Sequence, residues 1–334
     1  MWGASFVSEA VQLCEISGLS ISYELQDNVR VRALENLNLT LRSGEVVGIL
    51  GESGSGKSTL ATAVLRLLPA YARREQGTIL LRGRDLWALS KSELQRIRGR
   101  EISLVLQDPA LALNPVLTVG FQIGEPIRAH LPLSAKQGRL RVLELLTDVG
   151  FDRPVEIYGA FPHQLSGGQR QRVAIAQAIS CHPSLLIADE PTSKLDAPSQ
   201  AEIIAMLVRI RRKHELAILL ISHDPAIFPG FADRMAVMYA GKIVELGSTA
   251  QVFSDPLHPY TQALIGLARQ TFTTPSPVRA RFATIDGESP DPSNLPVGCR
   301  FYLRCRDRMD PCATHDPQAF LPEPGRSVNC FKYE

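Results

Sequence analysis

The glycine-rich segment "GESGSGKST", residues 51–59, determines which fold this chain can adopt. It matches the pattern G-x-x-x-x-G-K-[ST], whose glycines allow backbone N–H groups to point inward at phosphate oxygens. The apolar run Val46 to Leu50 precedes the segment, and a run that favours a helix, Lys57 to Leu68, follows it. A strand, a glycine loop and a helix in this order are typical of a parallel α/β core.

The residue types of this loop predict individual contacts with a nucleoside triphosphate. Lys57 would reach the β- and γ-phosphates, Ser58 would ligate Mg²⁺, and Thr59 would contact the α-phosphate. The N-terminal end of the following helix would add its partial positive charge. The loop residues that we expect to bind nucleotide are Gly51, Ser53, Gly54, Gly56, Lys57, Ser58 and Thr59.

Two acidic residues end a second apolar strand. The run "SLLIADE", residues 184–190, finishes with Asp189 and Glu190. In a phosphate-loop enzyme, an aspartate at this position holds Mg²⁺. The adjacent glutamate can polarise the attacking water as a general base. The pair therefore predicts a metal ligand and a catalytic residue.

Two further polar residues follow predicted core strands. His223 ends the run "AILLISH", where it would contact a γ-phosphate. Gln107 ends the run "EISLVLQ", where its amide can bridge Mg²⁺ and water without carrying charge. A lone histidine is most often structural, and a lone glutamine indicates nothing. The position of His223 after a second parallel strand favours a role at the phosphate.

A second glycine turn occurs more than a hundred residues after the first, in "LSGGQRQRVAIAQA", residues 165–178. Gly167 and Gly168 would let backbone N–H groups approach an anion. The helix that follows presents the positive end of its dipole to the same place. One chain therefore carries two phosphate-type turns.

Taken together, these motifs resemble those of the ATP-binding cassette ATPases. "GESGSGKST", Gln107, "LSGGQRQR", "LLIADE", "SKLD" and His223 occur in the order that the family shows. The resemblance implies an α/β phosphate-loop fold with a mainly parallel sheet core, an antiparallel β subdomain and a helical subdomain at about residues 110–175. The cassette would span residues 1–252. Residues 253–334, which are rich in proline, would form a small irregular extension with four cysteines.

The resemblance also implies that the second glycine turn serves another subunit. In that family two cassettes pack head to tail, and this turn of one closes over the γ-phosphate bound by the other. The residues implied in that contact are Ser166, Gly167, Gly168 and Gln169.

Two more positions are implied by the family's pattern. Tyr23, in "LSISYE", resembles the aromatic residue that stacks on adenine, although a strand favours tyrosine in any case. Asp196 ends "SKLD", residues 193–196, which resembles the loop that couples the two nucleotide sites. Most members carry a small residue where Lys194 stands, so coupling between the subunits is left open.

Composition limits the classes of function. The 334 residues are 45% apolar and 21% charged, which fits a folded globular protein of about two domains. A formal net charge of +2 argues against a nucleic-acid binder. The apolar runs are far shorter than a membrane span, and the N-terminus lacks the pattern of a secretory signal. We therefore expect a peripheral protein on the cytoplasmic face of a bacterial inner membrane, held there by partners.

Three segments resemble the peptide/nickel branch of importers. They are "LQDPALALNP" (106–115), "DPLHPYTQALIGLA" (255–268) and the cysteine-containing "GCRFYLRCRDRMDPC" (298–312). The resemblance implies an ATPase subunit that powers import of dipeptides or oligopeptides, with a second and different cassette, two permease subunits and an external binding protein as partners. Nickel chelates or other small solutes stay open as cargo. A soluble cassette ATPase outside transport and a regulatory cassette that does not hydrolyse ATP are the remaining alternatives.

The four C-terminal cysteines are spaced C-x5-C-x6-C-x17-C, at Cys299, Cys305, Cys312 and Cys330. This spacing matches neither common zinc sites nor the usual ferredoxin patterns. The resembling branch binds a [4Fe–4S] cluster here, with zinc or unmetallated thiols as alternatives. The interleaved arginines at positions 300, 304, 306 and 308 could offset the negative charge of such a cluster.

Overall fold

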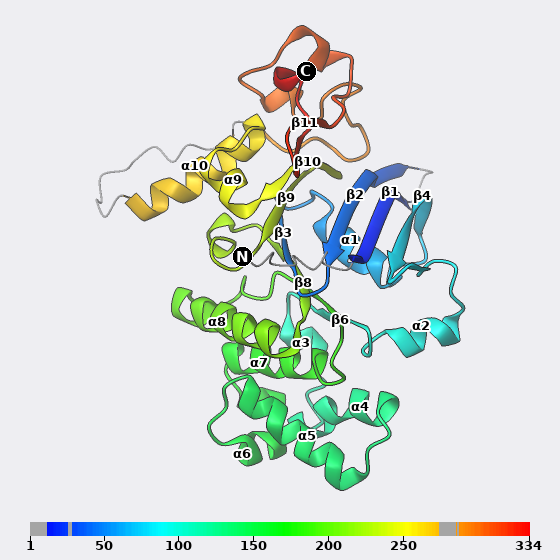
Figure 1. Ribbon diagram of the computed structural model, residues 1–334, viewed down its shortest axis with the longest axis vertical. Helices are drawn as coiled ribbons and strands as arrows, with labels where there is room; N and C mark the ends of the chain where they lie inside the picture. Colours follow the sequence, from blue (N-terminus) through cyan, green and yellow to red (C-terminus); the bar gives the residue numbers. More distant parts are fainter. Residues whose placement is uncertain (1–11, 26–28, 274–284, 286) are drawn as a thin grey trace, which may run out of the picture.

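The computed structural model describes residues 12–25, 29–273, 285 and 287–334. The start of the predicted cassette, residues 1–11, and Pro275 and Pro277 of the predicted extension lie outside the described residues. Figure 1 shows a central sheet with a helical part at one end of the molecule and the C-terminal residues at the other.

The central sheet has eight strands that come from the whole length of the chain. The pairs from β6 to β9 are parallel, and those from β9 to β11 are antiparallel. In spatial order the strands are β11 (Phe320–Glu323), β12 (Arg326–Val328), β10 (Lys242–Ser248), β9 (Arg234–Tyr239), β3 (Val46–Leu50), β8 (Ala217–Ser222), β7 (Leu185–Asp189) and β6 (Ile102–Val105). The predicted parallel core is confirmed.

The central strands are buried on both faces. Along β3, Val46 and Leu50 belong to a core cluster that includes residues of the helices α4 (Val119–His130), α5 (Ala135–Asp148), α7 (Gly167–Ala178) and α8 (Ala197–His214). Val47 and Ile49 point the other way, into a cluster with α1 and the second sheet. Since strand side chains alternate between faces, a continuous apolar run needs cover on both sides. This burial fixes the carboxyl end of β3, from which the phosphate loop starts.

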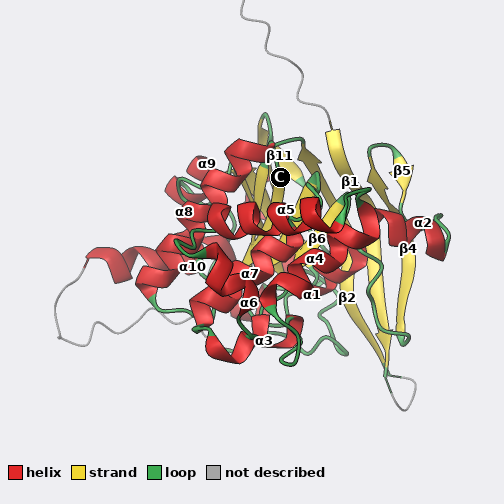
Figure 2. Cartoon of the chain, turned by 90° about the horizontal axis from the view of Figure 1, so that it is seen from below, coloured by secondary structure: helices red, strands yellow, loops and turns green. Residues whose placement is uncertain are grey.

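A second, four-stranded antiparallel sheet lies beside the first. Its strands are β2 (Arg30–Arg42), β1 (Gln12–Glu24), β4 (Ala72–Leu81) and β5 (Arg84–Asp85). The helices α1 (Lys57–Val64) and α2 (Lys91–Ile97) belong to this part of the chain. This sheet corresponds to the expected antiparallel β subdomain, and Figure 2 shows its long strands on one side of the helices.

The helical part occupies the lower end of Figure 1. Its helices are α3 (Pro109–Ala112), α4 (Val119–His130), α5 (Ala135–Asp148), α6 (Pro154–Gly159) and η2 (Pro162–Gln164). Two longer helices, α7 (Gly167–Ala178) and α8 (Ala197–His214), follow in the chain. Helices therefore make up most of the chain between Pro109 and Ala178.

The sequence pattern of residues 116–150 is helical, and its prolines predict breaks at Pro126 and Pro132. The predicted break at Pro126 is wrong, whereas the one at Pro132 is confirmed, since α4 ends at His130 and α5 begins at Ala135. Pro126 lies inside α4, which continues to His130. A proline in a helix leaves the carbonyl four residues earlier without its usual donor. Here the side chain of Gln177, on α7, donates to the carbonyl of Gln122 at 3.3 Å. Packing against a neighbouring helix thus satisfies the group that the proline leaves unpaired.

The C-terminal part contributes two strands to the central sheet. β12 pairs with β10 at Glu245–Val328 and Leu246–Ser327, and β11 pairs with β12. The short helix η3 (Pro225–Ile227) precedes β9. The helices that follow β10 are α9 (Thr249–Ser254), α10 (Pro259–Thr273), η4 (Tyr302–Arg304), η5 (Asp310–Ala313) and η6 (Phe331–Tyr333). The extension is irregular as expected, but it is built onto the cassette's own sheet.

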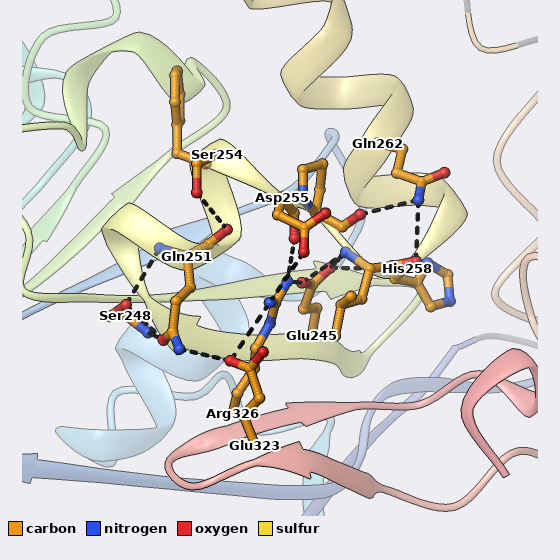
Figure 3. A network of polar contacts seen from close by, with 12 residues as sticks. Glu245, Ser248, Gln251, Ser254, Asp255, His258, Gln262, Glu323 and Arg326 are labelled. Carbon is orange, nitrogen blue, oxygen red and sulfur yellow. Dashed lines mark hydrogen bonds and ion pairs between the residues drawn. The ribbon is translucent and has the colours of Figure 1, made fainter.

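A buried polar network joins the two parts (Figure 3). Arg326 of β12 and Glu245 of β10 are almost completely buried and form an ion pair of 3.1 Å. Arg326 also donates to the backbone carbonyl of Asp255. Glu245 accepts from the backbone N–H groups of Leu257 and His258, at 3.0 and 2.9 Å. The hairpin is therefore anchored at the turn that leads into α10.

Candidate nucleotide site

A single cavity of about 930 Å³ contains most of the predicted nucleotide residues. It lies where β3, β7 and β8 end, and it is in the usual size range of small-molecule sites. The predicted residues that line it are Tyr23, Ser53, Gly54, Gly56, Lys57, Ser58, Thr59, Gln107, Glu190 and His223. The fold thus gathers residues from five separate segments of the sequence.

Two glycines of the loop are required by space. A Cβ atom on Gly51 would lie 2.4 Å from the carbonyl oxygen of Met238. Gly56 has φ of +100°, and its Cβ would lie 2.5 Å from the carbonyl oxygen of Ala33. Only glycine adopts this backbone without strain. The loop therefore packs directly against the backbone of neighbouring strands.

Lys57 is the buried cation of the site. Its Nζ donates to the carbonyl oxygens of Gly51 and Glu52, each at 2.8 Å. Burial lowers the pKa of Lys57, and the carboxylates of Glu190, Asp189 and Glu52 oppose that shift. An anion bound in the cavity would give this ammonium a stronger partner than the carbonyls that hold it here.

Asp189 fits the part of a magnesium ligand. Its Oδ1 is buried and has no hydrogen-bond partner among the described residues. Burial raises the pKa of Asp189, and a hydrogen bond from Ser58 and the charge of Lys57 act against the rise. A carboxylate oxygen without a partner, next to a hydroxyl, matches the oxygen ligands that Mg²⁺ prefers. Gln107 supplies an amide oxygen in the adjoining cavity.

The three residues predicted to be catalytic lie in contact with one another. Oε2 of Glu190 accepts a hydrogen bond from Nε2 of Gln107 at 2.9 Å and lies 3.1 Å from Nδ1 of His223. Glu190 has φ of +47°, in the left-handed region that non-glycine residues seldom adopt. Its N–H donates to the carbonyl of Ile221 at 3.0 Å, which holds it there. Strained residues of this kind concentrate at functional sites.

Tyr23 lines the same cavity. Its hydroxyl shares a hydrogen bond of 2.9 Å with Thr59 Oγ1, and its ring lies 5.7 Å from the ring of Tyr71. Val31 and Thr59 border the same half-buried ring in the cavity wall. The phenol is therefore held at Thr59, the last residue of the phosphate-loop segment.

The second glycine turn is remote from this cavity. Ser166 precedes α7 and accepts from the Gln169 N–H at 3.3 Å, while the Gln169 side chain accepts from the Ser166 N–H at 2.9 Å. This reciprocal contact caps the N-terminus of α7 and leaves the turn at the surface. Ser166, Gly168 and Gln169 line a separate depression, and none of the turn's described residues lines the nucleotide cavity.

Comparisons with known proteins agree with this geometry. A family model for ABC transporters matches residues 34–193, and one for the oligopeptide/dipeptide transporter C-terminal region matches residues 244–312. The chain is 40% identical over 321 residues to the dipeptide transport ATP-binding protein DppD of Bacillus subtilis (strain 168), covering 96% of this chain and 94% of that protein. This chain is an ATP-binding cassette protein.

Other relatives support the same membership. DppD of Escherichia coli (strain K12), also a dipeptide transport ATP-binding protein, is 39% identical over 318 residues, covering 95% of this chain and 96% of that protein. Among solved structures, the dimeric ATP-binding cassette MJ0796 in a post-hydrolysis state with ADP and Pi has a TM-score of 0.64 and 28% identity. It covers 71% of this chain and is itself covered over 99% of its length. The cassette fold is thereby established for this chain.

The loop after β7 has a contact that the family pattern does not suggest. Lys194, the unusual residue of this cassette, forms an ion pair with Asp108, the neighbour of Gln107. Asp196 precedes α8 without a side-chain cap to that helix. The loop implied to couple two nucleotide sites is thus tied to the loop that carries Gln107, within one chain.

The metal centre expected at the four cysteines is not supported by the described geometry. Among the described residues, no group of three or more His, Cys, Asp or Glu side chains could hold a metal ion. Two of the cysteines are nevertheless close together, since the N–H of Cys299 donates to the carbonyl of Cys312 at 2.9 Å. Burial raises the pKa of Cys299 to about 12; a backbone hydrogen bond from Phe301 acts against this rise, and the other three cysteines add to it. The cluster itself stays a prediction.

Several site residues were not found from the sequence. Tyr239, Ser289, Pro290, Pro292 and Leu295 also line the nucleotide cavity. Arg304, which we expected to offset a metal cluster, instead pairs with Glu52 of the phosphate loop. Its neighbour in the predicted set, Arg300, pairs with Glu35. These contacts span more than two hundred residues of sequence, so no local pattern signals them.

Proposed function

We propose that this chain is the ATP-hydrolysing subunit of a membrane transporter that imports dipeptides or oligopeptides. The observation that carries the proposal is the meeting of Gln107, Glu190 and His223 beside the phosphate loop, in a cassette whose relatives are named for dipeptide transport. Lys57 also lines this cavity, and Asp189, with a buried oxygen that has no partner among the described residues, ends the adjoining strand β7.

Each residue has a physical task in the proposed reaction. Glu190, oriented by Gln107, accepts the proton of the water that attacks the γ-phosphate. Lys57 and His223 balance the charge that develops on the transferred phosphoryl group. Ser58, Asp189 and Gln107 would hold Mg²⁺, which neutralises phosphate charge when bound. Tyr23 would stack on the adenine.

The test of the catalytic assignment is Glu190→Gln. The amide keeps the size of the side chain and loses the base, so we expect ATP binding and cassette pairing to persist while hydrolysis falls about 10²–10⁴-fold. ATP affinity and turnover would be measured on the assembled transporter. Near-normal turnover by this variant would contradict the role of Glu190, and failure of the wild type to bind ATP would contradict the function.

The surface turn of Ser166 supports a second cassette as partner. Because this turn lies outside its own chain's cavity, a head-to-tail pair would bring it to the other chain's γ-phosphate. Ser166, Gly167, Gly168 and Gln169 would then complete the site. We propose a different chain as that partner, as in the importers that this chain resembles, with Asp196 in the loop between the two sites.

Exposed apolar side chains support docking to a permease. In the segment after Gln107, the side chains of Leu111 and Val116 are 83% and 75% exposed. The nearby Leu106 and Phe121 are also exposed. Among the described residues, no helix is both long enough and apolar enough to cross a membrane. We propose that two permease subunits hold the protein at the cytoplasmic face of the membrane and that an external binding protein delivers the peptide.

We propose that Cys299, Cys305, Cys312 and Cys330 hold a [4Fe–4S] cluster. The backbone contact between Cys299 and Cys312, and the burial of Cys312 and Cys330, support a site shielded from solvent. A single zinc ion would need the four sulfurs in close contact, whereas a cluster spaces them farther apart. Anaerobically purified protein should contain about four iron atoms and four acid-labile sulfides. Stoichiometric zinc, or no metal, would overturn the assignment.

A further inference from the structure

The C-terminal extension reaches into the nucleotide site. Arg304, whose side chain is 6% exposed, donates to both carboxylate oxygens of Glu52, at 2.7 Å from Nη1 and 3.1 Å from Nη2. Glu52 is the second residue of the phosphate loop. A two-pronged guanidinium–carboxylate contact fixes orientation as well as distance. The loop is therefore held from outside by a residue 252 positions later in the chain.

Other groups from the later part of the chain hold the same residue. The N–H of Glu52 donates to the hydroxyl of Tyr260 at 2.9 Å, and Ser289 Oγ donates to Glu52 Oε2 at 3.3 Å. Arg304 also lies 3.3 Å from the Tyr239 hydroxyl. Both the backbone and the carboxylate of Glu52 are thus fixed by residues outside the loop.

An aromatic cluster keeps Arg304 in place. Phe301 of the extension is buried between Tyr239 and Tyr260, at ring distances of 5.2 and 5.4 Å. The guanidinium lies 5.8 Å from the centre of the Tyr239 ring and 6.0 Å from that of Phe301. A cation between aromatic rings gains from their negative faces. The arginine is thereby presented to the loop in one orientation.

The charge of Glu52 makes this contact consequential. Its carboxylate borders the cavity in which we place a triphosphate, and its carbonyl is one of the two that hold Lys57. A bare carboxylate there would repel the phosphates and would compete with them for Lys57. Arg304 neutralises that charge and directs the carboxylate toward the extension.

We infer that Arg304 is a positioning residue for the phosphate loop, and that the extension is a working part of the ATP site. The inference rests on the proposed function, since it concerns the same ATP site. In addition, Ser289, Pro290, Pro292 and Leu295 of the extension form part of the cavity wall. Affinity for ATP therefore depends on residues that lie outside the cassette boundary.

The test compares Arg304→Gln, Glu52→Gln and the double variant in the assembled transporter. We expect Arg304→Gln to raise both the Kd for ATP and KM about tenfold, which corresponds to about 1.4 kcal/mol, because Glu52 is left uncompensated. The turnover number should change less than about threefold, since Glu190 and His223 are untouched. Arg304→Lys keeps the positive charge but cannot contact both carboxylate oxygens as a guanidinium does, so its affinity for ATP should lie between those of the wild type and Arg304→Gln.

The double variant separates charge from mere scaffolding. Adding Glu52→Gln to Arg304→Gln should recover most of the lost affinity for ATP, because no unpaired carboxylate is left. If Arg304 had a purely structural role, the double variant would bind ATP no more tightly than Arg304→Gln alone. Lys332→Met is the matched control, because it breaks the exposed pair with Asp307 in the same extension. Unfolding temperatures would confirm that each variant is folded.

Two outcomes distinguish the inference from the function on which it rests. If wild-type protein binds and hydrolyses ATP and Arg304→Gln behaves like Lys332→Met, the inference is wrong and the function stands. If the wild type itself fails to bind ATP, the proposed function is wrong. Loss of turnover without a change in Kd or KM would also overturn the positioning role.

Discussion

At the scale of single residues, the nucleotide site contains groups that folding alone would not favour. Asp189 is buried with an oxygen that has no partner in the described part of the chain, Lys57 is buried near it, and Glu190 has a left-handed backbone. Each of these features costs stability. Such costs are expected where a site is shaped for a ligand.

Asp189→Asn tests this trade between stability and function. Burial raises the pKa of Asp189, so the folded protein binds this proton more tightly than the unfolded chain does. The contribution of Asp189 to the free energy of unfolding therefore falls as the pH rises from the ordinary aspartate pKa through the raised pKa of the folded protein. At neutral pH the neutral amide should raise the unfolding temperature of nucleotide-free protein, and that gain should vanish as pH falls toward 4.

The same substitution should damage catalysis. Loss of a direct magnesium ligand should lower ATP turnover by about 100-fold or more, since even supporting groups of metal sites contribute about 10–100-fold. Calorimetry across pH and ATPase assays across Mg²⁺ concentration are the measurements. A variant that is less stable than wild type at neutral pH would contradict the burial argument.

At the scale of elements, local patterns predicted the strands and helices well where burial is simple. The apolar runs ending at Leu50, Asp189 and Ser222 are strands buried on both faces, as their composition indicates. Pro126 misled the prediction because a side chain from α7 replaces the missing hydrogen bond. The sequence pattern did not predict the strand β4 (Ala72–Leu81), because the first half of this strand is polar and exposed.

At the scale of the whole molecule, the extension and the cassette share one sheet. The hairpin β11–β12 continues the central sheet, and the buried pair Arg326–Glu245 lies at the join (Figure 3). Arg326 is 2% exposed and Glu245 is 1% exposed, so neither can turn to water if the other is lost. The pair therefore makes the two parts fold as one.

Arg326→Met should destabilise the protein by about 3–5 kcal/mol, because it leaves the Glu245 carboxylate buried without its cation. Urea unfolding of the full chain would measure this change. Adding Glu245→Leu should restore part of the loss, since the second substitution removes the unpaired charge. Lys332→Met, which breaks an exposed pair, should cost less than about 1 kcal/mol. Equal effects of the buried and exposed substitutions would contradict the argument.

The sequence by itself determined the phosphate loop, the core strands, the order of the motifs and the family, because these depend on short patterns of residue type. The roles of Glu190 and His223 were expected from their places after core strands, and the resemblance to the family added Gln107 to the same site. Arg304, Tyr260 and Ser289 at the phosphate loop were decided by the tertiary structure alone. Their partner, Glu52, lies more than two hundred residues earlier, and only the folding of the extension onto the cassette brings the two together.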